Sequence, residues 1–323
     1  MSAIGERLGA SGRFDVARAR ALGILIPFVV LFITLSVTSG PFLTKVNLLN
    51  ILDQQSATLI IAAAGTLVLV AGGIDLSVGA VYSLAAVTAA EVAQHHNAWL
   101  AIFLGVAAGG LVGLVNGLVT TVLRINSLIA TLAMSFVIAG AASRITKGNL
   151  LVLFDNHSFG ELARTEFITV KTSIWLMVGA VIVLAIVLAR TTAGRYMYAA
   201  GGNAEAARLA GVRVDGVRIL TFVLSGLAAG VAGVIDASRV LSASASAEST
   251  TLAFTVLAGI VVGGTSILGG DGAVWRSVVG VLFIALIGNG YILLGLDPLY
   301  EQITMGVILL AAVGLDAWTR RTA

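Results

Sequence analysis

Long apolar stretches, separated by short polar connections, run along nearly the whole chain. A helix needs about 20 mostly apolar residues to cross a bilayer, and about ten stretches approach or exceed that length. They are 22–39, 48–71, 77–93, 98–123, 127–142, 172–189, 219–235, 252–268, 278–296 and 299–315. The pattern predicts an all-α polytopic membrane protein with about ten transmembrane helices.

The basic residues orient these predicted spans, because cytoplasmic loops hold an excess of Lys and Arg. With the N-terminus inside, about 13 of the 19 basic residues fall on the inner face, so both termini are expected to be cytoplasmic. The expected parts are an N-terminal tail (1–21), a membrane domain (22–316) and a C-terminal tail (317–323). Within the membrane domain, one long loop lies outside (144–173) and one inside (190–218). The basic N-terminus precedes a span without a clear small-residue cleavage site, which favours a retained tail over a signal peptide.

Composition supports a lipid environment. The chain is 58% hydrophobic and 11% charged, whereas soluble domains carry about 25% charged residues. Its 38 glycines and 3 prolines suit helices that pack closely through small residues. The absence of cysteine excludes disulfides and cysteine-based metal sites, and a net charge of +3 does not indicate nucleic-acid binding. No phosphate-binding loop or nucleophile–base set is present, so the chain is not expected to hydrolyse ATP or to be an enzyme.

The segment 201–211, GGNAEAARLAG, interrupts this apolar pattern inside the inner loop. Asn203 is a favourable N-cap, and Glu205 lies in the first turn, where the helix dipole favours an anion. Gly211 is suited to end the helix, and the double glycine before Asn203 is expected to let the backbone turn sharply. The segment predicts a short capped helix, which is either a docking element for a soluble partner or an interfacial connector.

Three further segments carry family information: GGIDLSVG (72–79), NGLVTTVLRINS (116–127) and GGTSILGGDG (263–272). Together with GRYMYAAGGNAEAARLAGV (194–212), they resemble the permease subunits of ribose-type ABC importers for monosaccharides. The resemblance extends from about Leu48 to Asp316.

This resemblance implies a permease dimer in the bacterial inner membrane, homodimeric or heterodimeric. It also implies a cytoplasmic ATP-binding subunit, which would bind the ATP and Mg, and a periplasmic sugar-binding protein. No cofactor is expected in this chain. The region 203–211 would be the coupling helix that contacts the ATPase. The residues implied in that coupling are Gly201, Gly202, Asn203, Glu205, Ala206, Ala207, Arg208 and Gly211.

Polar residues at membrane depth are costly and are therefore candidates for a translocation path. These candidates are Asn50, Asp53, Gln54, Gln55, Asn116, Asn289, Glu301 and Gln302. Amides and hydroxyls suit a neutral sugar, but the same side chains also hold helices together. Asp75 and Asp271 are expected at the inner membrane edge, where Asp75 either caps the following helix or pairs with Arg124 or Arg276.

Three other functions remain open from the sequence. A branched-chain amino-acid permease shares the broader family. An ion-coupled secondary transporter would bury paired carboxylates near the midplane, and Asp53 and Glu301 are the nearest approach to such a pair. A membrane-embedded enzyme is disfavoured because no metal or nucleophile set is recognisable.

Overall fold

The computed structural model describes residues 23–153, 157–245, 249–297 and 299–321, and almost all of its regular structure is helical. The membrane interior cannot hydrogen-bond to exposed backbone groups, so apolar segments of this length form helices. The long helices are Gly23–Thr38, α2 (Lys45–Gln54), α3 (Ser56–Val70), α4 (Val78–His95), α5 (Ala98–Thr121), α6 (Ser127–Thr146), α8 (Thr172–Arg190), α11 (Val214–Val240), α12 (Ser249–Val262), α13 (Val274–Leu293) and α14 (Leu299–Arg321).

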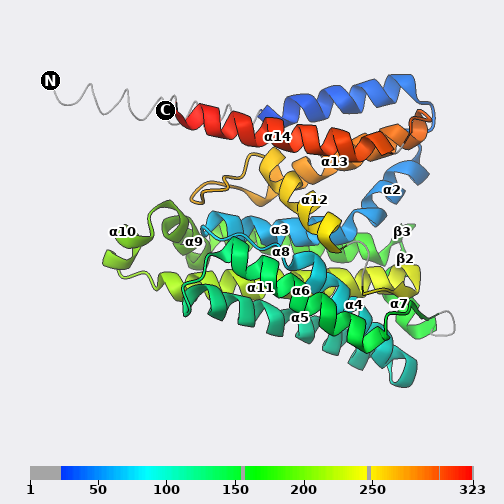
Figure 1. Cartoon of the computed structure of the whole chain (residues 1–323). Coiled ribbons are helices and arrows are strands. Elements are labelled where there is room, and N and C mark those ends of the chain that lie inside the picture. The colour runs from blue at the N-terminus through cyan, green and yellow to red at the C-terminus, as the bar shows by residue number, and fades with distance from the viewer. Residues whose placement is uncertain (1–22, 154–156, 246–248, 298, 322–323) are drawn as a thin grey trace.

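These helices lie roughly side by side, and the connecting elements gather at the two ends of the bundle (Figure 1). One end carries α9 (Thr192–Gly202) and α10 (Ala204–Leu209) and is called the α10 end here. The other, the α7 end, carries α7 (His157–Arg164) and two small antiparallel pairs of strands. These pairs are β1 (Leu151–Val152) with β4 (Ser242–Ala243), and β2 (Glu166–Phe167) with β3 (Val170–Lys171).

Each predicted stretch overlaps one helix, with α2 and α3 together forming the second. Among the described residues, five helices are long and apolar enough to cross a membrane, or six if the bent pair of α2 and α3 counts as one span. This confirms a polytopic helical membrane protein, and the count of ten spans stays a prediction. The 1–21 tail lies outside the described residues, as do the last two residues of the 317–323 tail.

One predicted stretch, 252–268, is helical only as far as Val262. The chain leaves the helix at Gly264, which has φ of +84°, and positive φ recurs at Gly269 and Gly270. Glycine adopts this left-handed backbone without steric cost. The apolar Ile267 and Leu268 therefore belong to a glycine-rich loop rather than to a span.

The core of the bundle forms around α3, because every residue of this helix is buried. Such a helix is apolar on all sides, unlike one that exposes a polar face. It bends by 50° against α2. At the break the Ser56 hydroxyl donates to the Asp53 carbonyl at 2.8 Å, so a side chain enters the backbone ladder there.

The close pairing of α5 with α11 is made by glycines four residues apart on α5: Gly105, Gly109, Gly113 and Gly117. A Cβ atom added to Gly109 would lie 2.4 Å from the Gly226 carbonyl oxygen. Small residues at this spacing let helix backbones approach closely in lipid. The abundance of glycine in the sequence thus has a direct structural use here.

We expect Gly109→Ala to destabilise the protein by about 2 kcal/mol, because the added methyl overpacks a backbone contact. Thermal unfolding in one detergent, followed by tryptophan fluorescence, measures the effect. Gly140→Ala on α6 is the matched control, since a Cβ there would meet nothing within 4 Å. It should be neutral or stabilise slightly through helix propensity. Equal losses in the two variants would contradict the packing argument.

Candidate functional site

Three of the glycine-rich motifs meet at the α10 end in what we call the glycine junction (Gly72, Gly201, Gly202, Gly269, Gly270). The Gly270 amide donates to the Val70 carbonyl at 2.9 Å. A Cβ added to Gly201 would lie 1.9 Å from that same carbonyl oxygen, and one added to Gly269 would lie 2.9 Å from the Gly72 Cα. Segments far apart in the sequence therefore contact one another backbone to backbone.

The expectation that Gly201 and Gly202 form a sharp turn is wrong. Both residues are the last turn of α9, and the chain leaves the helix at Asn203, whose backbone is extended. Glycine is required at position 201 because the neighbouring backbone leaves no space for a side chain. A close approach and a turn both select glycine, and the sequence does not distinguish them.

Polar contacts surround the glycine junction. The Tyr198 hydroxyl, on α9, donates to the Gly272 carbonyl at 2.7 Å. Burial raises the pKa of the Tyr198 phenol above its usual range, so the group remains a neutral donor at physiological pH. Asp271 and Arg276 form an ion pair at 2.8 Å within the segment that enters α13. These contacts attach α9 to the loop before α13.

The helix α10 projects beyond the junction as the sequence indicates. The Asn203 side chain accepts hydrogen bonds from the amides of Glu205 and Ala206 at 3.1 and 3.0 Å. Gly211, with φ of +85°, follows the helix, and the Val212 amide returns to the Ala207 carbonyl at 2.9 Å. Both ends of α10 are therefore capped.

The surface of α10 is open. Ala207 alone is buried within this helix, while the Leu209 side chain is 87% exposed. Arg208 pairs with Asp215 at 2.8 Å, between two exposed side chains. Leu209 therefore lies in an open, charged surface at the end of the bundle.

Asp75 caps α4 and pairs with neither arginine. One of its carboxylate oxygens accepts from the Ser77 amide and hydroxyl at 3.0 and 2.6 Å, and the other from the Ser225 hydroxyl at 2.8 Å. The carboxylate thus joins the start of α4 to the middle of α11. Of the two alternatives drawn from the sequence, the structure shows the contact at the start of α4; among the described residues no ion pair joins Asp75 to Arg124, and Arg276 is held by Asp271.

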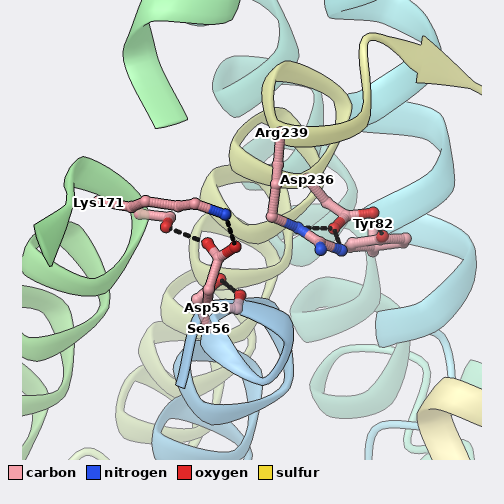
Figure 2. A network of polar contacts seen from close by, with 7 residues as sticks. Asp53, Ser56, Tyr82, Lys171, Asp236 and Arg239 are labelled. Carbon is pink, nitrogen blue, oxygen red and sulfur yellow. Dashed lines mark hydrogen bonds and ion pairs between the residues drawn. The ribbon is translucent and has the colours of Figure 1, made fainter. Parts of the chain in front are cut away.

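At the α7 end, Asp53 is buried and ion-paired (Figure 2). The Lys171 ammonium lies 2.6 Å from one carboxylate oxygen, and the Ser173 hydroxyl donates to the other at 2.5 Å. The Asp53 side chain is 5% exposed and that of Lys171 39%, so the cation has access to water and the anion does not. This pair joins the end of α2 to the start of α8.

A second charged cluster lies beside it in Figure 2. Arg239 bonds Asp236 within α11 at 2.5 Å, and the Tyr82 hydroxyl of α4 donates to the same carboxylate. The two clusters together place four charged side chains close to one another near the α7 end of the described bundle.

The other path candidates do not gather at one site. Asn116 donates to the Ser77 hydroxyl at 2.7 Å near the α10 end, and Asn289 exchanges hydrogen bonds with Asn47 at 2.9 and 3.2 Å. The remaining candidates differ in exposure: Asn50 and Gln54 are exposed, Gln55 and Glu301 are half-buried, and the side chain of Gln302 lies outside the described residues. Their assignment to a path stays a prediction.

Residues 47–313 match the protein family described as branched-chain amino acid transport system / permease component. The chain belongs to this permease family. The ribose import permease protein of Escherichia coli is 37% identical over 297 residues, which cover 90% of this chain and 92% of the relative. The L-arabinose ABC transporter permease protein of Azospirillum brasilense is 39% identical over 301 residues, covering 92% and 88%. The ribose import permease protein of Bacillus subtilis is 37% identical, covering 91% and 92%.

These matches confirm the resemblance drawn from the four motifs, and with the apolar helices they identify a multi-pass membrane permease. Several structural residues of the permease were not anticipated from the sequence. Lys171 and Ser173 hold Asp53 from 118 and 120 residues away, and Tyr198 closes onto Gly272 across 74 residues. The sequence offered one indication of Lys171 and Tyr198, namely the residue type. The polar tip of a lysine or tyrosine beside a span must lie in a polar environment.

The permease should tolerate a methyl group at Gly202 and not at Gly201. We expect Gly201→Ala to destabilise by about 3 kcal/mol, because its Cβ falls on the Val70 carbonyl. Gly202→Ala is the control, as its Cβ would lie 4.0 Å from the Gly270 Cα, the nearest atom of another segment, and should change stability by less than about 0.5 kcal/mol. The melting temperatures of the two purified variants are compared with that of the wild type. Similar values for both variants would refute the close contact at Gly201.

Lys171→Met should destabilise the permease more than Asp53→Asn does. Removing the lysine leaves a buried carboxylate without its cation, at a cost of about 2–3 kcal/mol. Asp53→Asn keeps an acceptor for Ser173 and frees a lysine that reaches water, at about 1 kcal/mol. The double variant should match Asp53→Asn within about 0.5 kcal/mol. Additive losses in this thermal-unfolding cycle would mean that the two side chains do not interact.

Proposed function

We propose that this chain is the permease subunit of an ATP-binding-cassette importer that carries a monosaccharide across the bacterial inner membrane. The observation that carries the proposal is the match, over about nine-tenths of both chains, to permeases named for ribose and L-arabinose import. Hydrolysis of ATP, with its Mg, takes place on separate cytoplasmic subunits. A second permease chain and a periplasmic sugar-binding protein complete the assembly.

In this proposal the α10 end faces the cytoplasm. The long helices that flank α9 and α10 end or begin there with Arg190, Arg213 and Arg218, and cytoplasmic ends are enriched in basic residues. The α14 helix also ends at this side of the bundle (Figure 1). Both termini would then be cytoplasmic, and the segment from β1 to β3 would be periplasmic.

The α10 helix is the proposed docking element for the ATP-binding subunit. Its exposed Leu209 and its charged Glu205 and Arg208 offer an apolar side chain with polar neighbours on a projecting surface, and arginine is a residue type enriched at interface hot spots. Movement of α10 would be passed through α9 to the glycine junction, and from there to the end of α3 and the start of α13. The coupling must be reciprocal, so docking of a loaded binding protein must alter ATP hydrolysis.

A neutral, hydroxyl-rich substrate needs hydrogen-bonding groups rather than a fixed charge along its path. The candidates Asn50, Gln54 and Gln55 supply amides next to the α2–α3 bend, while the Asp53 carboxylate is already neutralised by Lys171. Sugar recognition in this scheme belongs chiefly to the binding protein, and the permease needs only a low-affinity passage.

We expect Leu209→Ala to reduce stimulation of ATP hydrolysis by about fivefold, the effect of losing a contact worth about 1 kcal/mol at an interface. The measurement uses the complex reconstituted in liposomes with its ATP-binding subunit and a ribose- or arabinose-loaded binding protein. Glu205→Ala and Arg208→Ala should act in the same direction with smaller effects.

Arg190→Ala is the control, because Arg190 is exposed at the same end and lies outside α10. It should leave stimulation unchanged. Full stimulation of the Leu209 variant would remove α10 from the coupling interface. Sugar uptake without any ATP-binding subunit would overturn the importer assignment itself.

A further inference from the structure

A cavity of about 600 Å³ opens at the α10 end, between the loop that joins α5 to α6 and the start of α11. Its walls are mostly polar, and three of its side chains are guanidinium groups. The lining residues that the argument uses are Thr120, Arg124, Ser127, Arg208, Asp215 and Arg218. The proposed coupling scheme does not account for this cavity.

The cavity carries excess positive charge. Arg208 is neutralised by Asp215 at 2.8 Å. Arg218 donates to the Ala71 carbonyl at a long 3.4 Å, and no ion pair to Arg124 occurs among the described residues. Guanidinium groups that face a shared space repel one another and favour an anion between them.

The backbone at Arg124 is unusual. Its φ is +54°, in the left-handed region that non-glycine residues seldom adopt. Such a conformation costs on the order of 1 kcal/mol and persists where the surroundings impose it. Here the loop between two spans is held with Arg124 at the wall of the cavity.

Apolar side chains flank the arginine at the ends of the spans. Val122 is 67% exposed, Leu123 63% and Ile125 41%. Thr121 ends α5 and Ser127 begins α6, so these residues lie at the depth where headgroups meet acyl chains. The site therefore offers cationic hydrogen-bond donors beside a surface that suits lipid tails.

We propose that this cavity binds the phosphate group of an anionic phospholipid, held by Arg124 and Arg218. Guanidinium forks match phosphate oxygens in geometry and charge, and a basic pocket between spans is suited to an anionic headgroup. A free phosphate ion would satisfy the same donors but would make no use of the apolar rim. A bound lipid would link the α5–α6 loop to α11, next to the proposed docking helix, whatever solute the permease carries.

The test compares lipid binding by the purified full-length permease and by Arg124→Gln. The protein in neutral detergent is titrated with dioleoylphosphatidylglycerol, dioleoylphosphatidylcholine or inorganic phosphate, and bound lipid is counted by native mass spectrometry. We expect the wild type to prefer the anionic lipid and Arg124→Gln to lose about fivefold in its apparent affinity. Arg124→Lys, which keeps the charge, should retain most of the binding.

Arg190→Gln is the matched control, since it removes an exposed arginine at the same end that does not line the cavity. It should bind the anionic lipid like the wild type. Equal losses in Arg124→Gln and Arg190→Gln would overturn the proposal in favour of a diffuse surface field. Binding of inorganic phosphate, with no preference for the anionic lipid over the neutral one, would also overturn it, because the cavity would then be a site for the free ion. A melting temperature within about two degrees of the wild type in lipid-free detergent shows that each variant is folded.

Discussion

The backbone contacts among Gly72, Gly201 and Gly269 set the arrangement of the α10 end. They bring together the end of α3, the end of α9 and the loop before α13, with no side chain between them. Contacts of this kind are short-ranged and steric, so a displacement of one segment cannot be absorbed by rotation of a side chain. The projecting helix α10 is attached to this contact through α9, and its position is consequently tied to that of α3.

The α7 end contains charged side-chain contacts as well. There the ion pair of Asp53 with Lys171 joins α2 to the start of α8, and the Tyr82 hydroxyl joins α4 to the Asp236–Arg239 pair of α11. When one partner of an ion pair is near water, the hydration regained on separating the two charges offsets much of the lost attraction between them. Backbone also approaches backbone near this end, since a Cβ added to Gly233 would lie 2.2 Å from the Tyr82 carbonyl oxygen.

Features encoded locally were predictable from the sequence, and those that depend on distant partners were not. The length of an apolar stretch and the residues that cap a helix are local features. The helices, and the ends of α10 at Asn203 and Gly211, could therefore be predicted from the sequence. Glycine is required at position 201 because of the Val70 carbonyl, which is more than a hundred residues away in the sequence. The predicted turn at Gly201 was therefore wrong. The partner of Asp53 is equally remote. The prediction of a span as far as residue 268 is wrong after Val262, because mean hydropathy does not register the glycines that end the helix there.

The buried helix α3 physically connects the two ends. It begins next to the Asp53 cluster, ends at the glycine junction, and spans about 22 Å at 1.5 Å per residue. Since α3 is buried on every side and closely packed, we infer that a shift applied at Val70 would be passed along its axis. The break at Gln55 is then the point where that shift can become a change of angle against α2. Because Asp53 lies on α2 and its partners Lys171 and Ser173 lie at the start of α8, such a change of angle acts directly on the ion pair. The charged cluster thereby lies at one end of α3, and the glycine junction, through which the proposed docking helix α10 is attached, lies at the other.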